Sequence, residues 1–434
     1  MLLSLAGFGV AFGDQVVLVD VSLHLPRCGT FVIVGPAGAG KSTLLRTVAG
    51  LNAAQPSLRT WGYATFDGLP LSSSNHPQLV HQNARLLGVS LRENLVSGLE
   101  NRGAYTKAEQ DVLIGDLLAS RHLSHLNEHL GKSVALLSRL DKRRVAIVRQ
   151  LLRNPKALLV DEPTTALDDE DVGPLLALLR HEAEHRAVLV VTHNQAHARS
   201  LGGTTALLAG GVIHDVQPTE EFFSTRGSPP KDEFLRTGRC SIPSPNARPE
   251  DLAEDAPRPY AAPQPTTPPE VYGPRGFFWL LPGQLGGCPR PGVVGELEHD
   301  LDALQRLDAS VVVNLEETIV YPVEPLVARG FELWHQPIDD MDVPSLADAA
   351  ELCAAIEGAL AAGKAVVVHC RAGLGRTGLF MALYLIWQGT GAAEAFDRVR
   401  DINPKWIQSD SQIDFLPTFQ QFLGRADGGP PARV

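Results

Sequence analysis

Two glycine-rich turns constrain what this chain can fold into, because each joins an apolar run to a helical pattern. The first is GPAGAGKST at residues 35–43, after TFVIV, and the second is HCRAGLGRTG at residues 369–378, after KAVVV. Backbone N–H groups at the start of a helix bind anions, and glycines let them come close. The sequence therefore predicts two strand–turn–helix units, each suited to hold a phosphate group.

A proline-rich stretch separates these two units. Residues 241–270 hold nine of the 32 prolines and almost no large apolar side chains, which predicts a semi-extended linker. A chain of 434 residues is also too long for one core. We therefore predict a first domain at residues 1–240, the linker at 241–270 and a second domain at 271–434.

Both predicted domains alternate short β-rich runs with helical patterns. ALLVDEP and AVLVVTH alternate with VGPLLALLRHEAEH in the first domain, and SVVVNLEE and AVVVHC alternate with ADAAELCAAIEGALAAG in the second. This alternation predicts an α/β fold with a largely parallel sheet in each domain.

Charge and composition narrow the class of protein. The net charge of −11 argues against a nucleic-acid partner. Five scattered cysteines without metal-ligand spacing favour a reduced, cytoplasmic setting. The apolar start MLLSLAGFGVAFG has no basic residue before Arg27, so we expect a strand there and not a signal peptide. No apolar run reaches the roughly 18 residues of a membrane span.

The first turn satisfies G-x-x-x-x-G-K-[ST] between a strand and a helix, the pattern of a phosphate-binding P-loop. Its lysine is expected to reach the β- and γ-phosphates of ATP, and its serine hydroxyl to bind Mg²⁺. Downstream, the buried strand of ALLVDEP ends in Asp161, expected at the metal, and Glu162, expected at the attacking water. The predicted ATP-binding residues of the turn are Gly35, Gly38, Gly40, Lys41, Ser42 and Thr43.

Across roughly residues 1–240, these motifs resemble the ATP-binding-cassette (ABC) family, and most of all the ATPase subunit of phosphate importers. LVHQNARLL resembles the Q-loop, so the resemblance implies that Gln82 contacts the metal and nucleotide. TTALD resembles the D-loop around Asp168, VVTHN supplies the switch histidine His193, and Phe12 stands where an aromatic ring stacks on adenine. The resemblance also implies a second cassette as partner, in a homo- or heterodimer, and membrane permease subunits at the inner face of a membrane.

One ABC motif departs from the family. LSRLD replaces the signature loop Leu-Ser-Gly-Gly-Gln, so Ser138 is retained and Arg139, Leu140 and Asp141 are substitutions. In the family this loop closes on the γ-phosphate held by the opposite subunit, where a carboxylate would add like-charge repulsion. Two interpretations stay open: a slow but working ATPase, or a cassette that binds ATP and hydrolyses it poorly.

A histidine cluster lies just before that loop. His122, His125 and His129 in RHLSHLNEHL have the helical spacing i, i+3 and i+7. A metal site is one interpretation, and a polar helix face is the favoured one.

The second turn formally contains the dinucleotide pattern G-x-G-x-x-G. That pattern requires an acidic residue at the end of a following strand, whereas AEAFDRVRDI looks helical. A nucleophile loop explains more of the residues. Backbone N–H groups and Arg376 favour the thiolate of Cys370 and then bind the oxygens of a phosphate monoester, while Thr377 can donate a hydrogen bond to the sulfur.

Over roughly residues 271–425, the chain resembles the compact dual-specificity members of the cysteine-dependent protein tyrosine phosphatase superfamily. In HQPIDDMDVPS, which resembles the acid loop, Asp340 aligns best as the general acid, with Asp339 and Asp342 as competitors. In WIQSDSQ, Gln408 and Gln412 would place the hydrolytic water. The resemblance implies a cysteinyl-phosphate intermediate and no cofactor for this domain.

Three functions follow as hypotheses. The first combines ATP binding and hydrolysis by the cassette with a phosphatase that acts on phosphate monoesters of tyrosine, serine or threonine in proteins. The second is a phosphate-import type transporter ATPase with an accessory phosphatase tail. The third is an ATP-sensing signalling protein with a weakly hydrolysing cassette. Arg371 adds positive charge to the phosphatase loop, but similar loops occur in members that act on phosphoproteins and on inositol phospholipids.

Overall fold

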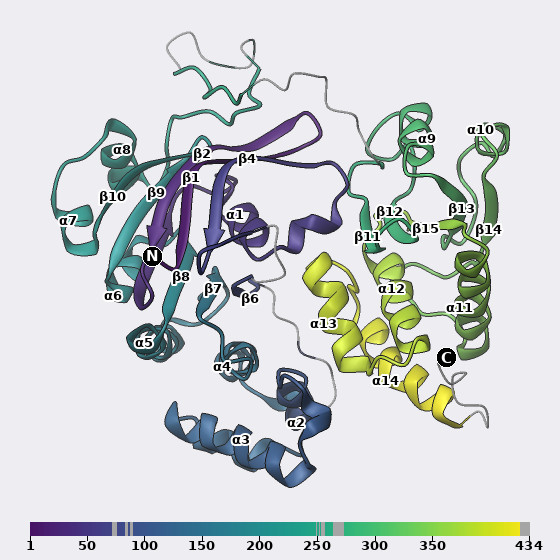
Figure 1. Cartoon of the computed structure of the whole chain (residues 1–434), viewed down its shortest axis with the longest axis horizontal. Helices are drawn as coiled ribbons and strands as arrows, with labels where there is room; N and C mark the ends of the chain where they lie inside the picture. The colour runs from purple at the N-terminus through teal and green to yellow at the C-terminus, as the bar shows by residue number, and fades with distance from the viewer. Residues whose placement is uncertain are drawn as a thin grey trace. The chain divides into compact units, whose positions relative to one another are not determined.

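A computed structural model shows the chain as two compact units, one mainly of residues 1–269 and the other mainly of residues 270–434 (Figure 1). The structure describes residues 1–71, 76–82, 86, 90–248, 250, 252, 257–263 and 273–425. Among these residues, no helix combines the length and the apolar character that crossing a membrane requires.

The first unit is built on a ten-stranded mixed sheet in the order β5-β4-β1-β2-β10-β9-β3-β8-β7-β6. Its strands β3, β7 and β8 are parallel, and their Val, Ile and Leu runs are buried on both faces. The strands are β1 (Leu3–Phe12), β2 (Gln15–Leu25), β3 (Gly29–Val34), β4 (Leu58–Phe66), β5 (Leu69–Pro70), β6 (Gln78–Val80), β7 (Ala157–Asp161), β8 (Ala187–Thr192), β9 (Thr204–Ala209) and β10 (Val212–Pro218).

Antiparallel pairing on one side of this sheet differs from the predicted, largely parallel arrangement. β1 pairs antiparallel with both β2 and β4, and β9 with β10. Gly13 at φ 60° lies in the short turn between β1 and β2. A turn this short forces antiparallel pairing, because a parallel connection needs a long crossover. Strands β6, β7, β8, β3 and β9 are parallel neighbours, and β10 also pairs parallel with β2 through Val212 and Asp20.

Helices of the first unit begin where side chains cap free backbone N–H groups. Ser90 and Thr106 form capping boxes with Glu93 and Glu109, and Ser138 caps the helix after it. The helices are α1 (Lys41–Val48), α2 (Leu91–Val96), α3 (Lys107–Ser120), α4 (Arg139–Leu151), α5 (Asp169–His185), α6 (Gln195–Leu201), α7 (Thr219–Ser224) and α8 (Pro229–Thr237). Short 3-10 helices span Leu51–Ala54, Arg102–Ala104, Ser124–His129 and Val134–Leu136.

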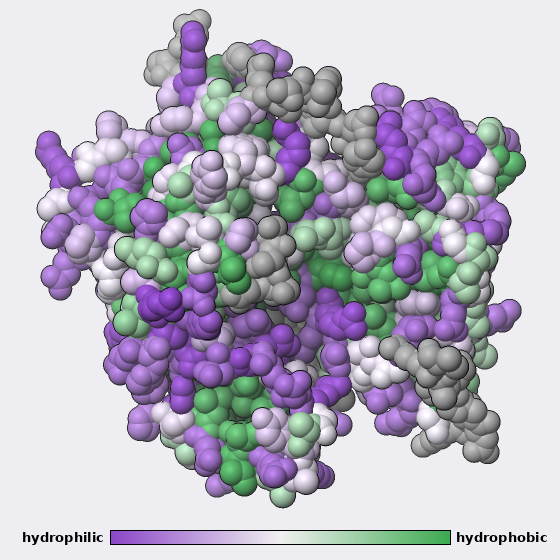
Figure 2. Space-filling view, in the orientation of Figure 1, coloured by the Kyte–Doolittle hydropathy of each residue, from purple (hydrophilic) through white to green (hydrophobic). Residues whose placement is uncertain are grey.

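Apolar side chains are exposed on α3. Figure 2 shows an apolar surface around α3, at the lower end of the first unit, where Val112 is 61% exposed and Leu113 is 39% exposed. Exposed apolar patches on a folded protein are common at contact surfaces for other proteins.

Part of the predicted linker packs against the first unit. The Asn246 side chain accepts a hydrogen bond from the Val16 N–H at 2.9 Å and donates one to the Val16 carbonyl at 2.5 Å. The ring of Tyr260 lies 5.8 Å from that of His214 on β10. Residues 249, 251, 253–256 and 264–270 of the predicted linker lie outside the described residues. The predicted domain boundaries stay a prediction.

The second unit has a five-stranded sheet in the order β11-β12-β15-β13-β14. Strands β12, β15, β13 and β14 are parallel and β11 is antiparallel, as expected for a mostly parallel sheet. The strands are β11 (Phe278–Leu281), β12 (Leu285–Pro289), β13 (Ala309–Asn314), β14 (Glu332–His335) and β15 (Ala365–Cys370). The helices are α9 (Leu297–Gln305), α10 (Glu324–Ala328), α11 (Leu346–Ala361), α12 (Gly375–Trp387), α13 (Ala392–Ile402) and α14 (Asp410–Arg425).

Successive side chains of β15 point alternately into two apolar clusters of the second unit. Val366 and Val368 pack into one apolar cluster with residues of α11 to α14, whereas Val367 packs into another with α9 and α10. Helix α12 is buried along almost its whole length. The loop between β15 and α12 is thereby held between two fully buried elements.

Two glycine-to-alanine variants test this packing. A Cβ on Gly378 in α12 would lie 2.4 Å from Trp406 Cβ, so we expect Gly378→Ala to destabilise the unit by about 1–3 kcal/mol. Gly358→Ala in α11 is the matched control, because its new Cβ meets nothing within 4 Å and should stabilise by about 0.5–1 kcal/mol.

Urea unfolding followed by tryptophan fluorescence measures both, since four of the five tryptophans lie after residue 270. Equal midpoints for the two variants would contradict the packing described for α12.

Candidate functional site

Cys370 lies at the end of β15, at the start of a tight loop that leads into α12 at Gly375. Its side chain is only 3% exposed. Gly373 has φ 66°, and a Cβ there would lie 2.3 Å from the Pro289 backbone nitrogen, so the loop closes only with glycine. The loop thus turns tightly between β15 and α12, and the predicted ring of backbone N–H groups around the sulfur stays a prediction.

Thr377 and Arg376 lie on the same side of the molecule as the sulfur. The Thr377 hydroxyl donates a hydrogen bond to Cys370 Sγ at 3.2 Å. Although burial opposes the charge, Glu317, Cys370 and Asp340 raise the pKa of Arg376 above its usual value. The sulfur and the guanidinium therefore belong to one site.

The Arg376 guanidinium also holds the acid loop. Its Nη1 donates to the Ile338 carbonyl at 2.6 Å and lies 3.0 Å from the Glu317 carboxylate, and its Nη2 lies 3.0 Å from Asp340 Oδ1. Its Nε is buried and has no hydrogen-bond partner within the described part of the chain. An unpaired donor of this kind, in the same site as the Cys370 thiol, is suited to a phosphoryl oxygen.

Of the three aspartates weighed as general acid, Asp340 is the one that pairs with Arg376. Its side chain is 72% exposed, so it can reach a substrate. Asp342 accepts a hydrogen bond from the next backbone N–H, of Val343. The catalytic roles of Asp340 and of the loop residues stay predictions.

Gln408 and Gln412 lie against the phosphatase loop. A Cβ on Gly375 would lie 3.2 Å from the Gln412 amide and 3.4 Å from the Gln408 amide oxygen. Gln412 is buried, accepts from the Gln408 N–H at 2.9 Å and donates to the Asp342 carbonyl at 3.3 Å. Gln412 therefore connects the loop region to the acid loop, in addition to its predicted role with water.

A buried network behind the loop was missed from the sequence. His369 is fully buried, and its Nε2 lies 2.8 Å from the Tyr321 hydroxyl. Burial, with the nearby Arg290 guanidinium, lowers the pKa of His369 to about 3. Arg290 pairs with Glu316 at 3.0 Å. Tyr321 and Glu316 follow β13 and carry no motif that could have marked them.

The P-loop of the first unit brings its predicted residues together. Lys41 Nζ donates to the carbonyls of Gly35 and Pro36 at 2.8 and 2.9 Å, and the Ser42 hydroxyl donates to Asp161 at 2.9 Å. Burial lowers the pKa of Lys41 and raises that of Asp161. A Cβ on Gly40, at φ 96°, would lie 2.7 Å from Leu18 Cδ2. A glycine cradle with a buried lysine and a serine–aspartate pair fits ATP with Mg²⁺.

Glu162 and His193 form a second pair in this site. The His193 Nδ1 lies 3.0 Å from the Glu162 carboxylate, and Lys41 Nζ lies 4.0 Å from the same carboxylate. Glu162 has a left-handed φ of 43°, which is uncommon outside glycine. Backbone conformations of this kind concentrate at functional sites, so the strain supports a role for Glu162.

The remaining cassette residues take separate positions. Phe12 ends β1 and is half-buried, Asp168 precedes the first residue of α5, and Thr43 lies in the first turn of α1. The Gln82 carbonyl accepts a hydrogen bond from Arg143. Residues 83–85 of the predicted Q-loop lie outside the described residues.

In the altered signature loop, Ser138 and Asp141 are hydrogen-bonded to each other. The Ser138 hydroxyl donates to Asp141 at 3.0 Å and accepts from the Asp141 N–H at 3.0 Å. His125 and Arg144 also bind Asp141, at 3.1 and 3.0 Å. Although partial burial opposes it, these three hydrogen-bond donors hold the pKa of Asp141 below its usual value. The Arg139 guanidinium donates to the Ala166 carbonyl of the D-loop.

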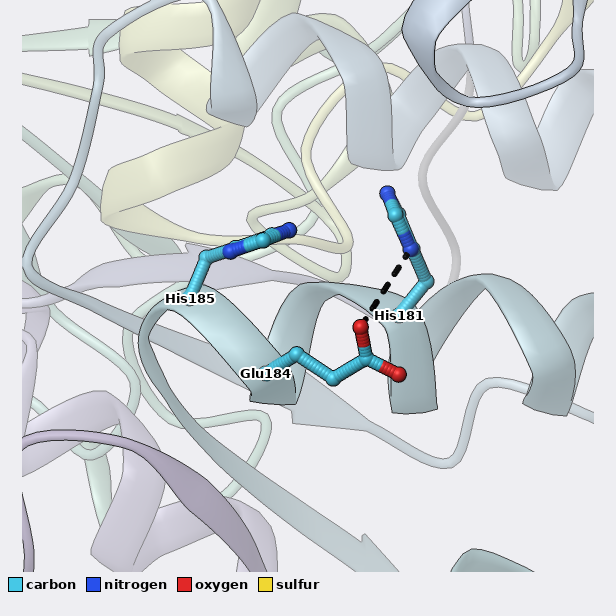
Figure 3. Close-up of side chains that lie close together, drawn as sticks. All are labelled: His181, Glu184 and His185. Atoms are coloured by element: carbon cyan, nitrogen blue, oxygen red, sulfur yellow. Dashed lines mark ion pairs between the residues drawn. The ribbon is translucent and has the colours of Figure 1, made fainter.

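The histidine cluster before this loop does not share one α-helix. Helix α3 ends at Ser120, His122 has φ 56°, and Ser124–His129 form a 3-10 helix. The structure instead brings together His181, Glu184 and His185 on one turn of α5, with His181 Nδ1 3.9 Å from Glu184 (Figure 3). The three come from one surface-exposed turn, and the sequence analysis did not single them out.

Two family models match parts of the chain. One, described as ABC transporter, matches residues 18–165, and the other, described as Polymorphic toxin system, DSP-PTPase phosphatase, matches residues 286–390. Both matches confirm the predicted combination of an ABC ATPase domain with a phosphatase-family domain. The ABC family implies ATP and, typically, Mg²⁺.

Curated relatives match the first unit. A phosphate import ATP-binding protein PstB 2 of Bacillus licheniformis is 26% identical over 243 residues, 54% of this chain and 88% of that protein. A second PstB 2, of Shouchella clausii, is 27% identical over 234 residues, 52% of this chain and 87% of that protein. Among solved structures, an ATP-binding subunit of an ABC transporter matches with a TM-score of 0.45 and 22% identity, over 54% of this chain and 100% of that one.

Acid should destabilise the second unit through His369. The unfolded histidine takes up a proton near pH 6.5, whereas the folded one does so only near pH 3. Between these values the unfolded state binds more protons, so stability falls as pH falls, by about 2 kcal/mol at pH 5. We expect His369→Asn to remove this loss, measured as the free energy of unfolding at pH 7 and pH 5.

The exposed His299→Asn is the control and should keep the acid sensitivity of the unsubstituted chain. An acid sensitivity that is unchanged in His369→Asn would show that His369 is not a buried neutral histidine.

Proposed function

We propose that this chain, which joins an ABC ATPase domain to a phosphatase domain of the dual-specificity type, hydrolyses phosphate monoesters at Cys370. The observation that carries the proposal is the 3.2 Å hydrogen bond from Thr377 to Cys370 Sγ, in a loop that also holds the buried Arg376. Each of the three has a role in phosphoryl transfer through sulfur.

The reaction would proceed in two displacements. In the first, the Cys370 thiolate attacks phosphorus in line, an S–P bond forms, and the P–O bond to the leaving group breaks. Asp340 gives its proton to the leaving oxygen. In the second, water attacks phosphorus, Asp340 takes the proton from that water, and the S–P bond breaks. Arg376 Nε and the loop N–H groups hold the phosphoryl oxygens in both steps.

The positions of Thr377, Gln408 and Gln412 support these assignments. Thr377 stabilises the sulfur when it leaves as a thiolate, because its hydroxyl already donates to Sγ. Gln408 and Gln412, which lie against Gly375, would place the water of the second step. This chemistry assigns every proton to a side chain or to water, so we propose that the phosphatase domain works without a cofactor.

The substrate class that we propose is a phosphorylated tyrosine, serine or threonine in a protein. The description of the matching family model, DSP-PTPase phosphatase, supports this class, whereas the Cys370–Arg376 loop by itself suits phosphoproteins and inositol phospholipids alike. Inositol phospholipids are therefore the alternative that substrate profiling would separate.

For the cassette, we infer ATP hydrolysis with Mg²⁺, which supplies charge neutralisation at the β- and γ-phosphates. Lys41 and the P-loop glycines would bind the phosphates, Phe12 would stack on adenine, and Ser42, Gln82 and Asp161 would hold the metal. Glu162 and His193 would act on the attacking water. The 3.0 Å contact between them supports a joint role.

The partners follow from the relatives, which are named as phosphate import ATP-binding proteins. We propose that a second cassette and a membrane permease join this chain at the cytoplasmic face of a membrane. The exposed Val112 and Leu113 on α3 are suited to a protein contact. We also propose that the first domain ends at residue 240 and that the second begins after residue 270.

A second candidate function is an ATP sensor with little turnover. The observation that favours it is the signature position, where Asp141 is ionised and holds the Ser138 hydroxyl. The Ser138 hydroxyl is therefore not free to bind a γ-phosphate across a cassette dimer. The Asp141 carboxylate would also repel that phosphate, because both are negatively charged.

The phosphatase proposal predicts hydrolysis of p-nitrophenyl phosphate in the presence of EDTA. Replacing the nucleophile in Cys370→Ser should lower kcat by about 1,000-fold or more. The exposed Cys28→Ser, in the first unit, is the matched control and should keep full activity. Comparable turnover by Cys370→Ser would reject sulfur as the nucleophile.

A variant of the signature loop distinguishes ATP hydrolysis from ATP sensing by the cassette. Arg139→Gly with Asp141→Gln removes the charge and frees Ser138, so ATP turnover per cassette should rise by at least about tenfold if Asp141 repels the γ-phosphate. Phosphate release from ATP at saturating Mg²⁺ measures it, with Lys41→Ala as the inactive control. High turnover by the unsubstituted chain, unchanged in the variant, would rule out the sensor function.

A further inference from the structure

The acid loop of the phosphatase domain is held by two serines that the reaction scheme does not use. Ser409 and Ser411 both donate hydrogen bonds to the Met341 carbonyl, at 2.7 and 3.1 Å, and their hydroxyls lie 2.9 Å from each other. Met341 follows Asp340 directly. One carbonyl of the acid loop is thus fixed by both serines at the start of α14.

The backbone at this carbonyl is not in a relaxed conformation. Met341 has φ 64°, a left-handed value that is uncommon for a side chain of this size. Such a conformation persists only where surrounding contacts hold it. The contacts here are the two serine hydroxyls and the Gln412 amide, which donates to the neighbouring Asp342 carbonyl at 3.3 Å.

The loop is therefore fixed from two sides. From the phosphatase loop, Arg376 binds Ile338 and Asp340, and from the start of α14, Ser409, Ser411 and Gln412 bind the two residues that follow. Helix α14 packs in the same apolar cluster as α12, so both anchors rest on one rigid core (Figure 1). A loop held at both ends keeps its central carboxylate at a constant distance from Cys370.

We propose that Ser409 and Ser411 are positioning residues that hold the acid loop in its proton-donating position, an inference that rests on the proposed phosphatase function. Ser409 also accepts from the Gln412 N–H at 3.2 Å, so it caps α14 as well. Ser411 has no such capping contact among the hydrogen bonds of the described residues. The two roles must be separated by the test.

The dependence of kcat on the leaving group separates the positioning role of the serines from the capping role. Proton donation matters more for phenyl phosphate than for p-nitrophenyl phosphate, because phenol is the poorer leaving group. We expect Ser409→Ala with Ser411→Ala to lower kcat for phenyl phosphate about tenfold and for p-nitrophenyl phosphate less than about threefold, with KM little changed. Thr418→Ala, on the exposed side of α14, is the control and should leave both values unchanged.

A double-mutant cycle with Asp340→Asn decides the mechanism. If the serines act through Asp340, their removal costs no further activity on phenyl phosphate once the carboxylate is gone. An equal loss in both backgrounds, or an equal loss on both esters, would show a general structural effect and overturn the proposal. If the unsubstituted chain hydrolyses neither ester, the phosphatase function fails; if it is active and the serine variant is too, only the positioning role fails.

Discussion

A buried guanidinium is the constraint on which the second unit depends. Arg376 is 2% exposed, and a charge buried so completely must be compensated. Its partners come from two other segments, Glu317 after β13 and the acid loop at Ile338 and Asp340, while Cys370 of its own loop also favours the charge. One side chain therefore joins these segments, and its buried Nε keeps no hydrogen-bond partner among the described residues.

The predicted nucleotide site also contains a buried charge whose partners compensate it. Lys41 is buried and binds two backbone carbonyls of its own loop, while Ser42 joins Asp161 across the sheet. In both units a glycine-rich turn follows a mostly or fully buried parallel strand, β3 or β15, and precedes a helix, α1 or α12. The units differ in the reactive group that we propose for each: the Cys370 thiol in one, and the Glu162 carboxylate beside His193 in the other.

The altered signature loop shows how substitutions can preserve a fold and change a surface. Ser138 caps α4, as its hydroxyl accepts from the Asp141 N–H, and the same hydroxyl donates to the Asp141 carboxylate in the first turn of that helix. Arg139 and Arg143 tie this helix to the D-loop carbonyls of Ala166 and Thr165. The Ser138 hydroxyl and the Asp141 carboxylate are thus paired within the loop, and Asp141 adds a negative charge that the Leu-Ser-Gly-Gly-Gln motif of the family does not carry.

Local patterns in the sequence determined both strand–turn–helix units, the contacts of the P-loop residues and the hydrogen bond from Thr377 to Cys370. These features depend on neighbours along the chain, where apolar runs, glycines and short spacings are sufficient. The antiparallel side of the first sheet was missed because a short turn outweighs the general α/β alternation.

Tertiary structure alone decided which aspartate meets Arg376, because the resemblance favours Asp340 over Asp339 and Asp342 but does not specify a contact with the guanidinium. It also brought Tyr321 to His369 and Ser409 to Met341, pairs that are 48 and 68 residues apart. No local pattern specifies such contacts, since they arise where separate elements pack on a shared core.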